Sequence, residues 1–284
     1  MDTPVVHHYA DLDDVMMHYV RAGSGPPVVL LHGWPQTWYE WRHVIPALAE
    51  RHTVIAPDLR GLGDSSRPEA GYDKRTVAND VWRLVRDHLG FERFHLVGHD
   101  WGGPTAYALA AAHPEAVATL AILDVVIPGD GGDFSQGGRR WHHAFHMTPD
   151  LPEALVQGRE RAYLGWFYRE FGYKPDAISD ADVDEYLRTY TRPGALRAGF
   201  AYYRNLPVDA AHNRETIARF KLPMPVLALG GAKARGRGAE VEQSMRRVAS
   251  NVEAAIVPDC GHWIPEEQPR FLLDRLFRLF GSGA

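Results

Sequence analysis

Short apolar runs alternate with segments of helical spacing over the first half of the chain. The run at 28–31 is continuously apolar, which is typical of a strand buried on both faces of a parallel sheet. The pattern predicts strands over 5–12, 15–20, 28–31, 53–56, 94–97 and 117–126. Between the buried runs it predicts helices over 38–50, 76–89 and 101–112. Alternating strands and helices with short connections predict an α/β protein whose mostly parallel sheet is flanked by helices.

The alternation breaks after residue 128. A stretch over 128–138 is rich in Gly and Asp, and residues 139–217 show helical spacing only, with predicted helices over 152–171, 180–191 and 194–205. The alternation then resumes with strands over 225–229 and 252–257 and helices over 239–249 and 268–280. We therefore predict a core domain of residues 1–128 and 218–284 and an inserted helical cap of residues 129–217. Such a cap would lie over the carboxyl ends of the strands, where open α/β sheets bind ligands.

Composition and charge narrow the function classes. The chain has 284 residues, 45% hydrophobic and 24% charged, which excludes intrinsic disorder. Its single cysteine, Cys260, cannot form an intrachain disulfide, and this favours a reducing compartment such as the cytoplasm. A net charge of −5 gives no electrostatic footprint for nucleic acid or an anionic membrane. We find neither a signal-peptide pattern nor an apolar run near the ~18 residues of a spanning helix, so we expect neither a nucleic acid nor a membrane partner.

The strongest chemical signal is Gly-His-Asp-Trp-Gly-Gly at 98–103, between a predicted strand and a predicted helix. Gly-x-Asp-x-Gly has the spacing of a nucleophile elbow, with Asp100 where a serine usually stands. Gly98 and Gly102 allow backbone to pass close on both sides of a tight turn, which lifts the Asp100 side chain above the sheet. A plain helix N-cap is the alternative, since Asp suits that position too. A cap, however, needs neither the flanking glycines nor the preceding apolar strand.

An aspartate at this position selects the class of substrate. A serine that attacks a saturated carbon would form an ether, which water cleaves too slowly to be useful. A carboxylate that attacks the same carbon forms an ester, and water frees the enzyme by attacking the ester carbonyl. Asp100 therefore indicates an electrophilic sp3 carbon with an oxygen or halide leaving group, and it argues against esters, amides and peptides as substrates.

Two more motifs complete a hydrolytic site. His-Gly-Trp-Pro at 32–35 ends a buried strand, and the residue after His-Gly typically offers a backbone N–H to an oxyanion. Here that residue is Trp34, paired with the N–H of Trp101; an ordinary strand-ending turn is the alternative. His262, in Asp-Cys-Gly-His-Trp-Ile-Pro at 259–265, follows the last predicted strand and is the candidate base, in the chain order nucleophile, acid, histidine.

Together these motifs resemble the α/β-hydrolase-fold epoxide hydrolases that use an aspartate nucleophile. The resemblance covers residues 5–282 and includes Gln-Thr-Trp-Tyr-Glu-Trp at 36–41 and Asp-Leu-Arg-Gly-Leu-Gly-Asp-Ser at 58–65. It implies an α/β-hydrolase fold, a hydrolase acting on ether bonds, and a small-molecule epoxide and water as substrates. It separates epoxide hydrolases less well from dehalogenases, which share His-Asp-Trp-Gly.

The acid partner of His262 departs from a common pattern of that family. Many epoxide hydrolases place the acid just after the strand that follows the cap, but here that loop, 230–238, is basic and contains no carboxylate. A basic loop cannot hold an imidazolium. The superfamily's other location follows the strand after the nucleophile helix, where Asp124 ends an apolar strand and needs a partner. We assign the acid to Asp124, with Glu240 and Glu242 as alternatives; this placement resembles a subgroup with some bacterial epoxide hydrolases and the fluoroacetate dehalogenases.

The resemblance also implies cap side chains, usually two tyrosines, that donate to the epoxide oxygen. The late donor resembles Tyr203, and the early one resembles His142, as in the subgroup with a His–Tyr pair. Packing within the cap is the alternative role for both, and the substitutes are Tyr202, His143 and Tyr163. We predict apolar pocket walls from Trp34, Trp38, Trp101, Trp141, Trp166 and Phe167.

Three histidines of the cap also raise the question of a metal. His142 and His146 are spaced i, i+4, which places two ligands on one helix face, with His143 beside them. No carboxylate or cysteine lies nearby in sequence to complete a shell, so we expect no metal, and the catalytic interpretation needs no cofactor.

Two alternative functions stay open: a haloalkane or haloacid dehalogenase, and a non-catalytic ligand-binding protein of the same fold. Trp101 and Pro104 occupy the stretch where haloacid enzymes place arginines. Monomer and homodimer both stay open.

Overall fold

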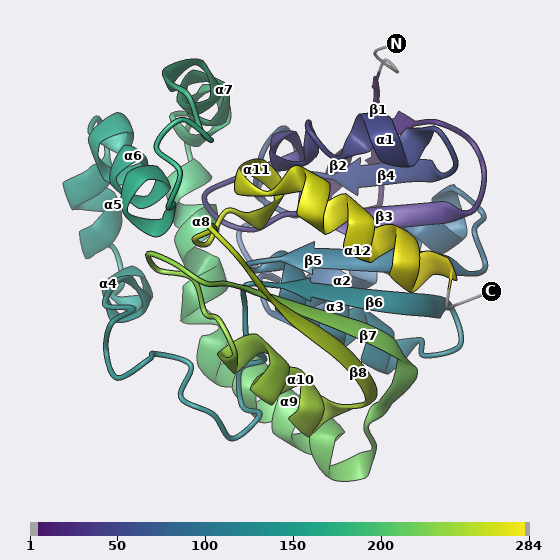
Figure 1. Cartoon of the computed structure of the whole chain (residues 1–284). Helices are drawn as coiled ribbons and strands as arrows, with labels where there is room; N and C mark the ends of the chain where they lie inside the picture. Colours follow the sequence, from purple (N-terminus) through teal and green to yellow (C-terminus); the bar gives the residue numbers. More distant parts are fainter. Residues whose placement is uncertain (1–4, 282–284) are drawn as a thin grey trace.

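The computed structural model describes residues 5–281 and contains an eight-stranded sheet in the order β1-β2-β4-β3-β5-β6-β7-β8 (Figure 1). The strands are β1 (Val6–Asp11), β2 (Met16–Ala22), β3 (Pro27–Leu31), β4 (Thr53–Pro57), β5 (Phe94–His99), β6 (Val117–Leu123), β7 (Leu222–Gly231) and β8 (Ala249–Val257). β2 pairs antiparallel with β1 and β4, and the remaining neighbours pair in parallel. The prediction of an α/β fold with a mostly parallel sheet is confirmed.

Helices pack on both faces of this sheet (Figure 1). Outside the predicted cap they are η1 (Trp38–Trp41), α1 (Ile45–Ala49), α2 (Lys74–Trp82), η2 (Arg83–His88), α3 (Gly102–Ala112), α10 (Glu240–Val248), α11 (Ile264–Glu267) and α12 (Pro269–Gly281). The helix predicted over 38–50 is divided into η1 and α1. Pro46 stands in the first turn of α1, where its missing N–H leaves no hydrogen bond unmade, so a new helix begins there.

Between β6 and β7 the described chain forms helices only. They are α4 (His142–Met147), α5 (Leu151–Val156), α6 (Glu160–Phe171), α7 (Asp180–Tyr190), α8 (Ala195–Arg204) and α9 (Leu206–Arg219). The helix predicted over 152–171 is interrupted near Gly158, whose φ of +77° is not helical. In Figure 1, α4 to α8 lie beyond one end of the sheet, whereas α9 runs back along the core. Asp209 of α9 pairs with Lys74 of α2 at 3.0 Å. The division into a cap of residues 129–217 and a core stays a prediction.

Alternate residues of the central strands face two separate hydrophobic cores. Val29 and Leu31 pack in a cluster that includes residues of α2 and α3. Val28 and Leu30 face the opposite side and pack with α1 and α12. Because helices cover both faces, every position of such a strand is apolar, and this produces the continuous runs in the sequence. The parallel strands end at the edge of the sheet nearest the predicted cap (Figure 1).

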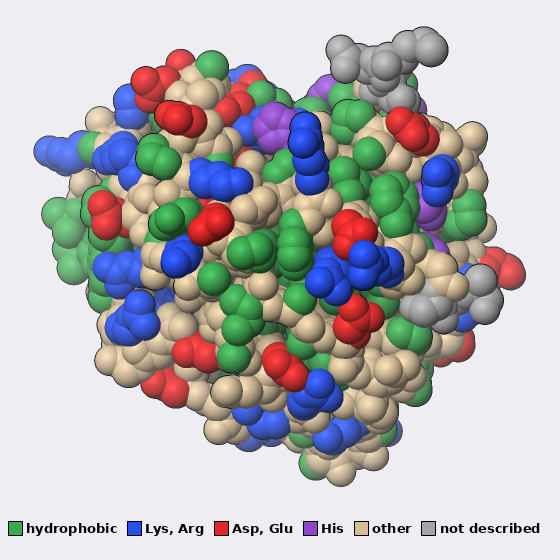
Figure 2. All heavy atoms as spheres, viewed as in Figure 1, with side chains coloured by type: hydrophobic (Ala, Val, Ile, Leu, Met, Phe, Trp, Pro, Cys, Tyr) green, Lys and Arg blue, Asp and Glu red, His purple; other side chains and the backbone are tan. Residues whose placement is uncertain are grey.

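The surface view and the lengths of the helices give no further indication of function. Among residues 5–281, no helix has the length and apolar character needed to cross a membrane. Figure 2 shows one face of the molecule, on which acidic and basic side chains are interspersed among apolar ones. Two of the candidate catalytic residues, Asp124 and His262, are instead buried, and they follow the ends of β6 and β8.

Candidate active site

Asp100 stands at a sharp bend between β5 and α3. Its φ is +47°, a left-handed conformation that is strained for a residue with a side chain. The flanking glycines make the bend sterically feasible. A Cβ on Gly98 would lie 2.3 Å from the Gly102 carbonyl oxygen, and a Cβ on Gly102 would lie 2.1 Å from the carbonyl oxygen of Leu31. The elbow predicted from the glycine spacing is therefore present, and it projects a carboxylate above the sheet.

The Asp100 carboxylate has two oxygens in different surroundings. Oδ1 accepts a hydrogen bond from the Trp34 backbone N–H at 2.9 Å, and Oδ2 lies 3.5 Å from His262 Nε2. The side chain keeps 18% of its surface exposed. Burial acts to raise the pKa of Asp100, but hydrogen bonding and attraction from His262 outweigh it and hold the pKa well below its usual value, with the Trp101 N–H contributing. The carboxylate is thus ionised at neutral pH, as a nucleophile must be.

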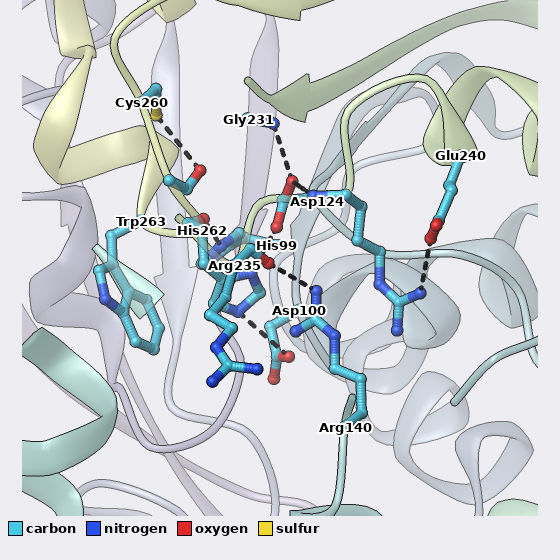
Figure 3. Close-up of polar contacts among 12 residues, drawn as sticks. His99, Asp100, Asp124, Arg140, Gly231, Arg235, Glu240, Cys260, His262 and Trp263 are labelled. Carbon is cyan, nitrogen blue, oxygen red and sulfur yellow. Dashed lines mark hydrogen bonds and ion pairs between the residues drawn. The ribbon is translucent and has the colours of Figure 1, made fainter. Parts of the chain in front are cut away.

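Asp124 holds the other nitrogen of His262. Its Oδ2 lies 2.6 Å from His262 Nδ1, and Oδ1 accepts hydrogen bonds from the backbone N–H groups of Gly231 and Arg237, each at 2.8 Å (Figure 3). Burial acts to raise the pKa of Asp124, but the bond to His262 keeps it lowered. An ionised carboxylate at Nδ1 places a ring proton there and directs Nε2 toward Asp100. The basic loop after β7 thus contributes through backbone N–H groups, which its side-chain composition does not reveal.

The two alternative acids are engaged elsewhere. Glu240 Oε2 accepts from Gln136 at 2.7 Å and lies 3.3 Å from Arg237 Nη1. Glu242 pairs with Arg246 at 2.8 Å on the same helix. The geometry therefore favours Asp124 as the partner of His262.

His142 of α4 and Tyr203 of α8 face Asp100 across a common cavity. Their ring centroids lie 5.7 Å apart, and His142 Nδ1 is buried without a hydrogen-bond partner among the described residues. Burial is the main cause that lowers the pKa of His142 well below its usual value, and repulsion from the neighbouring His143 is the second. Burial, then Asp100, raise the pKa of Tyr203 well above its usual value. At neutral pH the pair is a neutral imidazole and a protonated phenol, and both can donate to an oxygen.

The cavity itself is small, at about 20 Å³, room for roughly one water. A substrate larger than water therefore fits only if the groups that line the cavity move apart. Trp34, Trp101 and Phe167 line it as predicted. The residues that line it without having been predicted in that role are Pro35, Val125, Phe134, Arg140, His143, Phe171, Arg237 and Trp263.

Three predicted wall residues lie elsewhere, and the structure corrects the prediction for them. Trp38 packs in the second core near Tyr39. Trp141 is 44% exposed and lies in an outer depression of the cap beside Trp166. Trp141 directly precedes His142, and one helical step of about 100° turns it away from the cavity side. We predicted these residues as pocket walls because they are large and aromatic, but the direction of each side chain decides whether it lines the cavity.

A second layer of buried polar groups supports the histidine loop. His99 Nε2 lies 2.9 Å from the His262 carbonyl oxygen, to which it can only donate, and His99 Nδ1 lies 3.1 Å from Glu40 Oε2. Burial and the Asp100 carboxylate raise the pKa of Glu40 well above its usual value. Glu40 Oε2 is thus engaged by His99, whereas Glu40 Oε1 is buried without a hydrogen-bond partner among the described residues. The motif Gln-Thr-Trp-Tyr-Glu-Trp at 36–41 thus contributes Glu40 to the support of the His262 loop.

Metal-ligand geometry occurs at one place in the described chain, away from this cavity. Ligand atoms of His18, Asp58 and Asp64 lie within 4.8 Å of one another. These groups already have protein partners: His18 Nδ1 lies 2.7 Å from Asp58, and Asp64 pairs with Arg188 at 2.6 Å. The cluster is therefore accounted for as a buried ion-pair network. The three cap histidines, His142, His143 and His146, do not form such a group among residues 5–281.

Comparisons with known proteins agree with this geometry. The family model described as "alpha/beta hydrolase fold" matches residues 26–269. The chain is 43% identical to the "Soluble epoxide hydrolase" of Corynebacterium sp. (strain C12), over 99% of both proteins. It belongs to the α/β-hydrolase-fold epoxide hydrolases. The solved structure of the epoxide hydrolase CorEH without ligand superposes with a TM-score of 0.92 at 42% identity and covers 98% of this chain and 99% of that one.

A dehalogenase is also among the relatives of this epoxide hydrolase family member. The chain is 37% identical to a "Fluoroacetate dehalogenase" of Burkholderia sp., over 68% of this chain and 67% of that protein. The alignment is shorter and less similar than that with the soluble epoxide hydrolase. The ranking of epoxide hydrolase before dehalogenase, made from the motifs, is confirmed.

Proposed function

We propose that this chain hydrolyses an epoxide to a vicinal diol through a covalent ester on Asp100. In the first step Oδ2 of Asp100 attacks an epoxide carbon and the ring C–O bond breaks, while Oδ1 stays hydrogen-bonded to the Trp34 N–H. Tyr203 and His142 donate hydrogen bonds to the ring oxygen. Because charge builds on that oxygen only as the ring opens, these bonds stabilise the transition state more than the bound substrate.

Water cleaves the ester in the second step. His262 takes a proton from water at Nε2, and the Asp124 carboxylate at Nδ1 stabilises the resulting imidazolium. The attacked carbonyl belongs to Asp100 itself, and its oxyanion is held by the N–H groups of Trp34 and Trp101. As this intermediate collapses, His262 returns its proton to the leaving oxygen and the diol is released. The proton left on the Asp100 carboxyl replaces the one that the cap donors pass to the ring oxygen, which restores the carboxylate.

One observation carries the proposal. An ionised aspartate at a nucleophile elbow lies 3.5 Å from the free nitrogen of a histidine, and two cap hydrogen-bond donors line the same cavity. A carboxylate nucleophile fits a saturated carbon, and two donors opposite it fit an oxygen leaving group that stays attached to the substrate.

Intact-mass spectrometry of His262→Gln tests both steps together. Without the base, the ester forms but is not cleaved, so the protein should gain the full mass of a neutral epoxide such as styrene oxide. The matched control is Asp100→Asn in the same background, which should gain nothing. A folded His262→Gln protein that stays unmodified by epoxides would contradict the mechanism.

A dehalogenase is the second candidate. The indole Nε1 atoms of Trp34 and Trp101 are buried without hydrogen-bond partners among residues 5–281, and a leaving halide could accept from them. In the same His262→Gln experiment a haloalkane would add its mass minus hydrogen halide. Halide release from 1-bromoalkanes, with no diol from epoxides, would reverse the order of the two candidates. A protein that only binds ligands would turn over neither class.

The cellular setting completes the proposal. A small-molecule epoxide and water are the partners that the mechanism requires. The single cysteine, Cys260, is buried and unpaired and is compatible with the cytoplasm. Sedimentation analysis distinguishes a monomer from a homodimer.

A further inference from the structure

Two buried arginines line the catalytic cavity outside every motif of the elbow and triad. Arg140 lies two residues before the start of α4, and Arg237 lies in the loop between β7 and α10; they are 4% and 5% exposed. Figure 3 shows the Arg140 guanidinium beside Asp100. A charged group buried to this degree requires compensating charge or hydrogen bonds.

The hydrogen bonds of Arg140 are incomplete. Its Nε donates to Gln136 Oε1 at 2.9 Å and its Nη2 to the Arg235 carbonyl oxygen at 2.8 Å. Its Nη1 has no hydrogen-bond partner among residues 5–281. The ring of Phe171 lies 5.2 Å from the guanidinium carbon and supports the group from one side. Burial and repulsion from Arg237 lower the pKa of Arg140 to about 9, so the group is still charged at neutral pH but poorly compensated.

Arg237 extends the positive charge of the same wall. Its Nη2 donates to the Phe134 carbonyl oxygen at 3.0 Å, and its Nη1 lies 3.3 Å from Glu240, which is half-exposed. The guanidinium carbon lies 5.1 Å from the ring centroid of Phe134. Both arginines are therefore held by aromatic rings and backbone carbonyls at the cavity wall, and among the described residues no buried carboxylate forms an ion pair with either guanidinium.

The charge balance of the cavity changes during the reaction. In the free enzyme, Asp100, Asp124 and the half-exposed Glu240 oppose the two guanidinium groups. When Asp100 becomes an ester, its negative charge passes to the ring oxygen. Once that oxygen has gained a proton, the two guanidinium groups have lost one of their buried counter-charges. A neutral substrate does nothing to compensate this loss. A substrate that brings its own negative charge would restore the balance throughout the step.

We propose that the substrate of this cavity is an epoxide that carries a carboxylate next to the ring. Arg140 binds that carboxylate, and Arg237 adds positive charge to the same wall. This inference rests on the proposed function. Planar guanidinium groups suit a planar carboxylate. The position next to the ring follows because the arginines line the same small cavity as Asp100.

The reaction itself keeps its balance. Asp100 forms a C–O bond to one ring carbon as the ring C–O bond breaks, the ring oxygen gains a proton by way of the cap donors, and water then cleaves the ester. The carboxylate is not altered, and the product is a 2,3-dihydroxycarboxylate. No arginine directly follows the nucleophile in the sequence, but two other segments of the chain bring arginines to the cavity.

The test compares glycidate with glycidamide, which have the same ring and differ in charge. Their intrinsic reactivity differs, so the informative quantity is the ratio of kcat/KM for the two substrates in each protein. Arg140→Gln should lower the glycidate-to-glycidamide ratio by about 10- to 100-fold, the range for loss of a charge-assisted hydrogen bond. Arg140→Lys keeps the charge without the planar fork and should lie between Gln and the native residue.

The control is Arg139→Gln, which removes the same charge from an exposed neighbour and should leave the ratio unchanged. Propanoate should also inhibit the native enzyme competitively more strongly than propanamide, which tests the site without any variant. Equal inhibition by the two, or an unchanged ratio in a folded Arg140→Gln, overturns the inference.

Failure of the inference is separable from failure of the proposed function. If styrene oxide still forms the ester in His262→Gln while the glycidate preference is absent, the mechanism stands and the carboxylate site does not. If 2-chloropropanoate releases chloride and no epoxide forms an ester, both the substrate class and the function proposed above are wrong.

Discussion

The two walls of the catalytic cavity are built in different ways. The core wall holds Asp100, Asp124 and His262, each directly after a strand or in the loop that follows one, and connected by hydrogen bonds of 2.6–2.9 Å to each other or to backbone groups. The cap wall holds His142 and Tyr203 on separate helices, and both residues line the cavity. The core wall thus positions the groups that make and break bonds. The cap wall presents donors that only a substrate would satisfy.

This contrast indicates how the work is divided. Groups that must reach one geometry in every turnover sit on a rigid sheet edge, and groups that choose the substrate sit on an insertion able to move. Substitutions on the core wall should stop the chemistry whatever the epoxide. Substitutions on the cap wall should change how fast the ring opens and which epoxides are accepted.

The largest expected effect is on the core wall. Asp124→Asn keeps the shape but removes the charge that stabilises the His262 imidazolium, so ester hydrolysis should slow by about 10⁴-fold, the scale seen when such an acid is neutralised. The ester should then accumulate during turnover, as mass spectrometry of quenched samples would show. Glu240→Gln serves as control, and with a neutral epoxide it should change kcat by less than about threefold. Equal losses in both variants would remove the assignment of the acid.

An intermediate effect is expected for the cap donor. Tyr203→Phe removes one hydrogen bond to the opening ring, so ester formation should slow by about 10- to 100-fold while ester hydrolysis is retained. Single-turnover measurements separate the two steps. Tyr202→Phe is the matched control, because the neighbouring hydroxyl donates to the Arg60 carbonyl oxygen instead of facing Asp100. That control should cost about 1 kcal/mol of unfolding free energy and leave the rate alone; slower ester formation in the control instead would reassign the donor.

The smallest effect is expected for the aromatic residues of the cap, and it tests which of them line the cavity. Trp141→Leu should change kcat/KM by less than about threefold, because the side chain lies in the outer depression of the cap. Phe167→Leu alters the cavity itself, and its KM should move by several-fold, on the order of 1 kcal/mol. The comparison uses steady-state kinetics with one neutral epoxide. A larger change for Trp141 would mean that the outer depression takes part in binding.

The secondary structure of the core could be predicted from the sequence more accurately than that of the cap. The core strands were predictable because burial on both faces makes every position apolar, as at Val28 to Leu31. The cap helices were predicted with wrong divisions, since breaks such as the one at Gly158 and the separate helix α9 depend on local turns and on packing against α2. Apolar periodicity does not record those contacts.

The site shows the same limit at the level of single residues. Asp100 and His262 were recognisable because glycine spacing and position after a strand mark the bends that carry them. Arg140 and Arg237 have no such mark: one lies near α4 and the other in a loop 97 positions later, and the sequence shows a basic loop without saying where its side chains point. The catalytic roles of all these residues stay predictions for the experiments above.

By itself the sequence determined the alternation of sheet and helix, the family, and the presence of a carboxylate nucleophile with a late histidine, because backbone conformation and reaction chemistry restrict residue types at fixed local spacing. Only the tertiary structure decided which acid meets the histidine, which aromatic rings line the cavity, and that two arginines from separate segments share its wall. Those outcomes depend on the directions of side chains brought together from distant parts of the chain, and local spacing does not encode such directions.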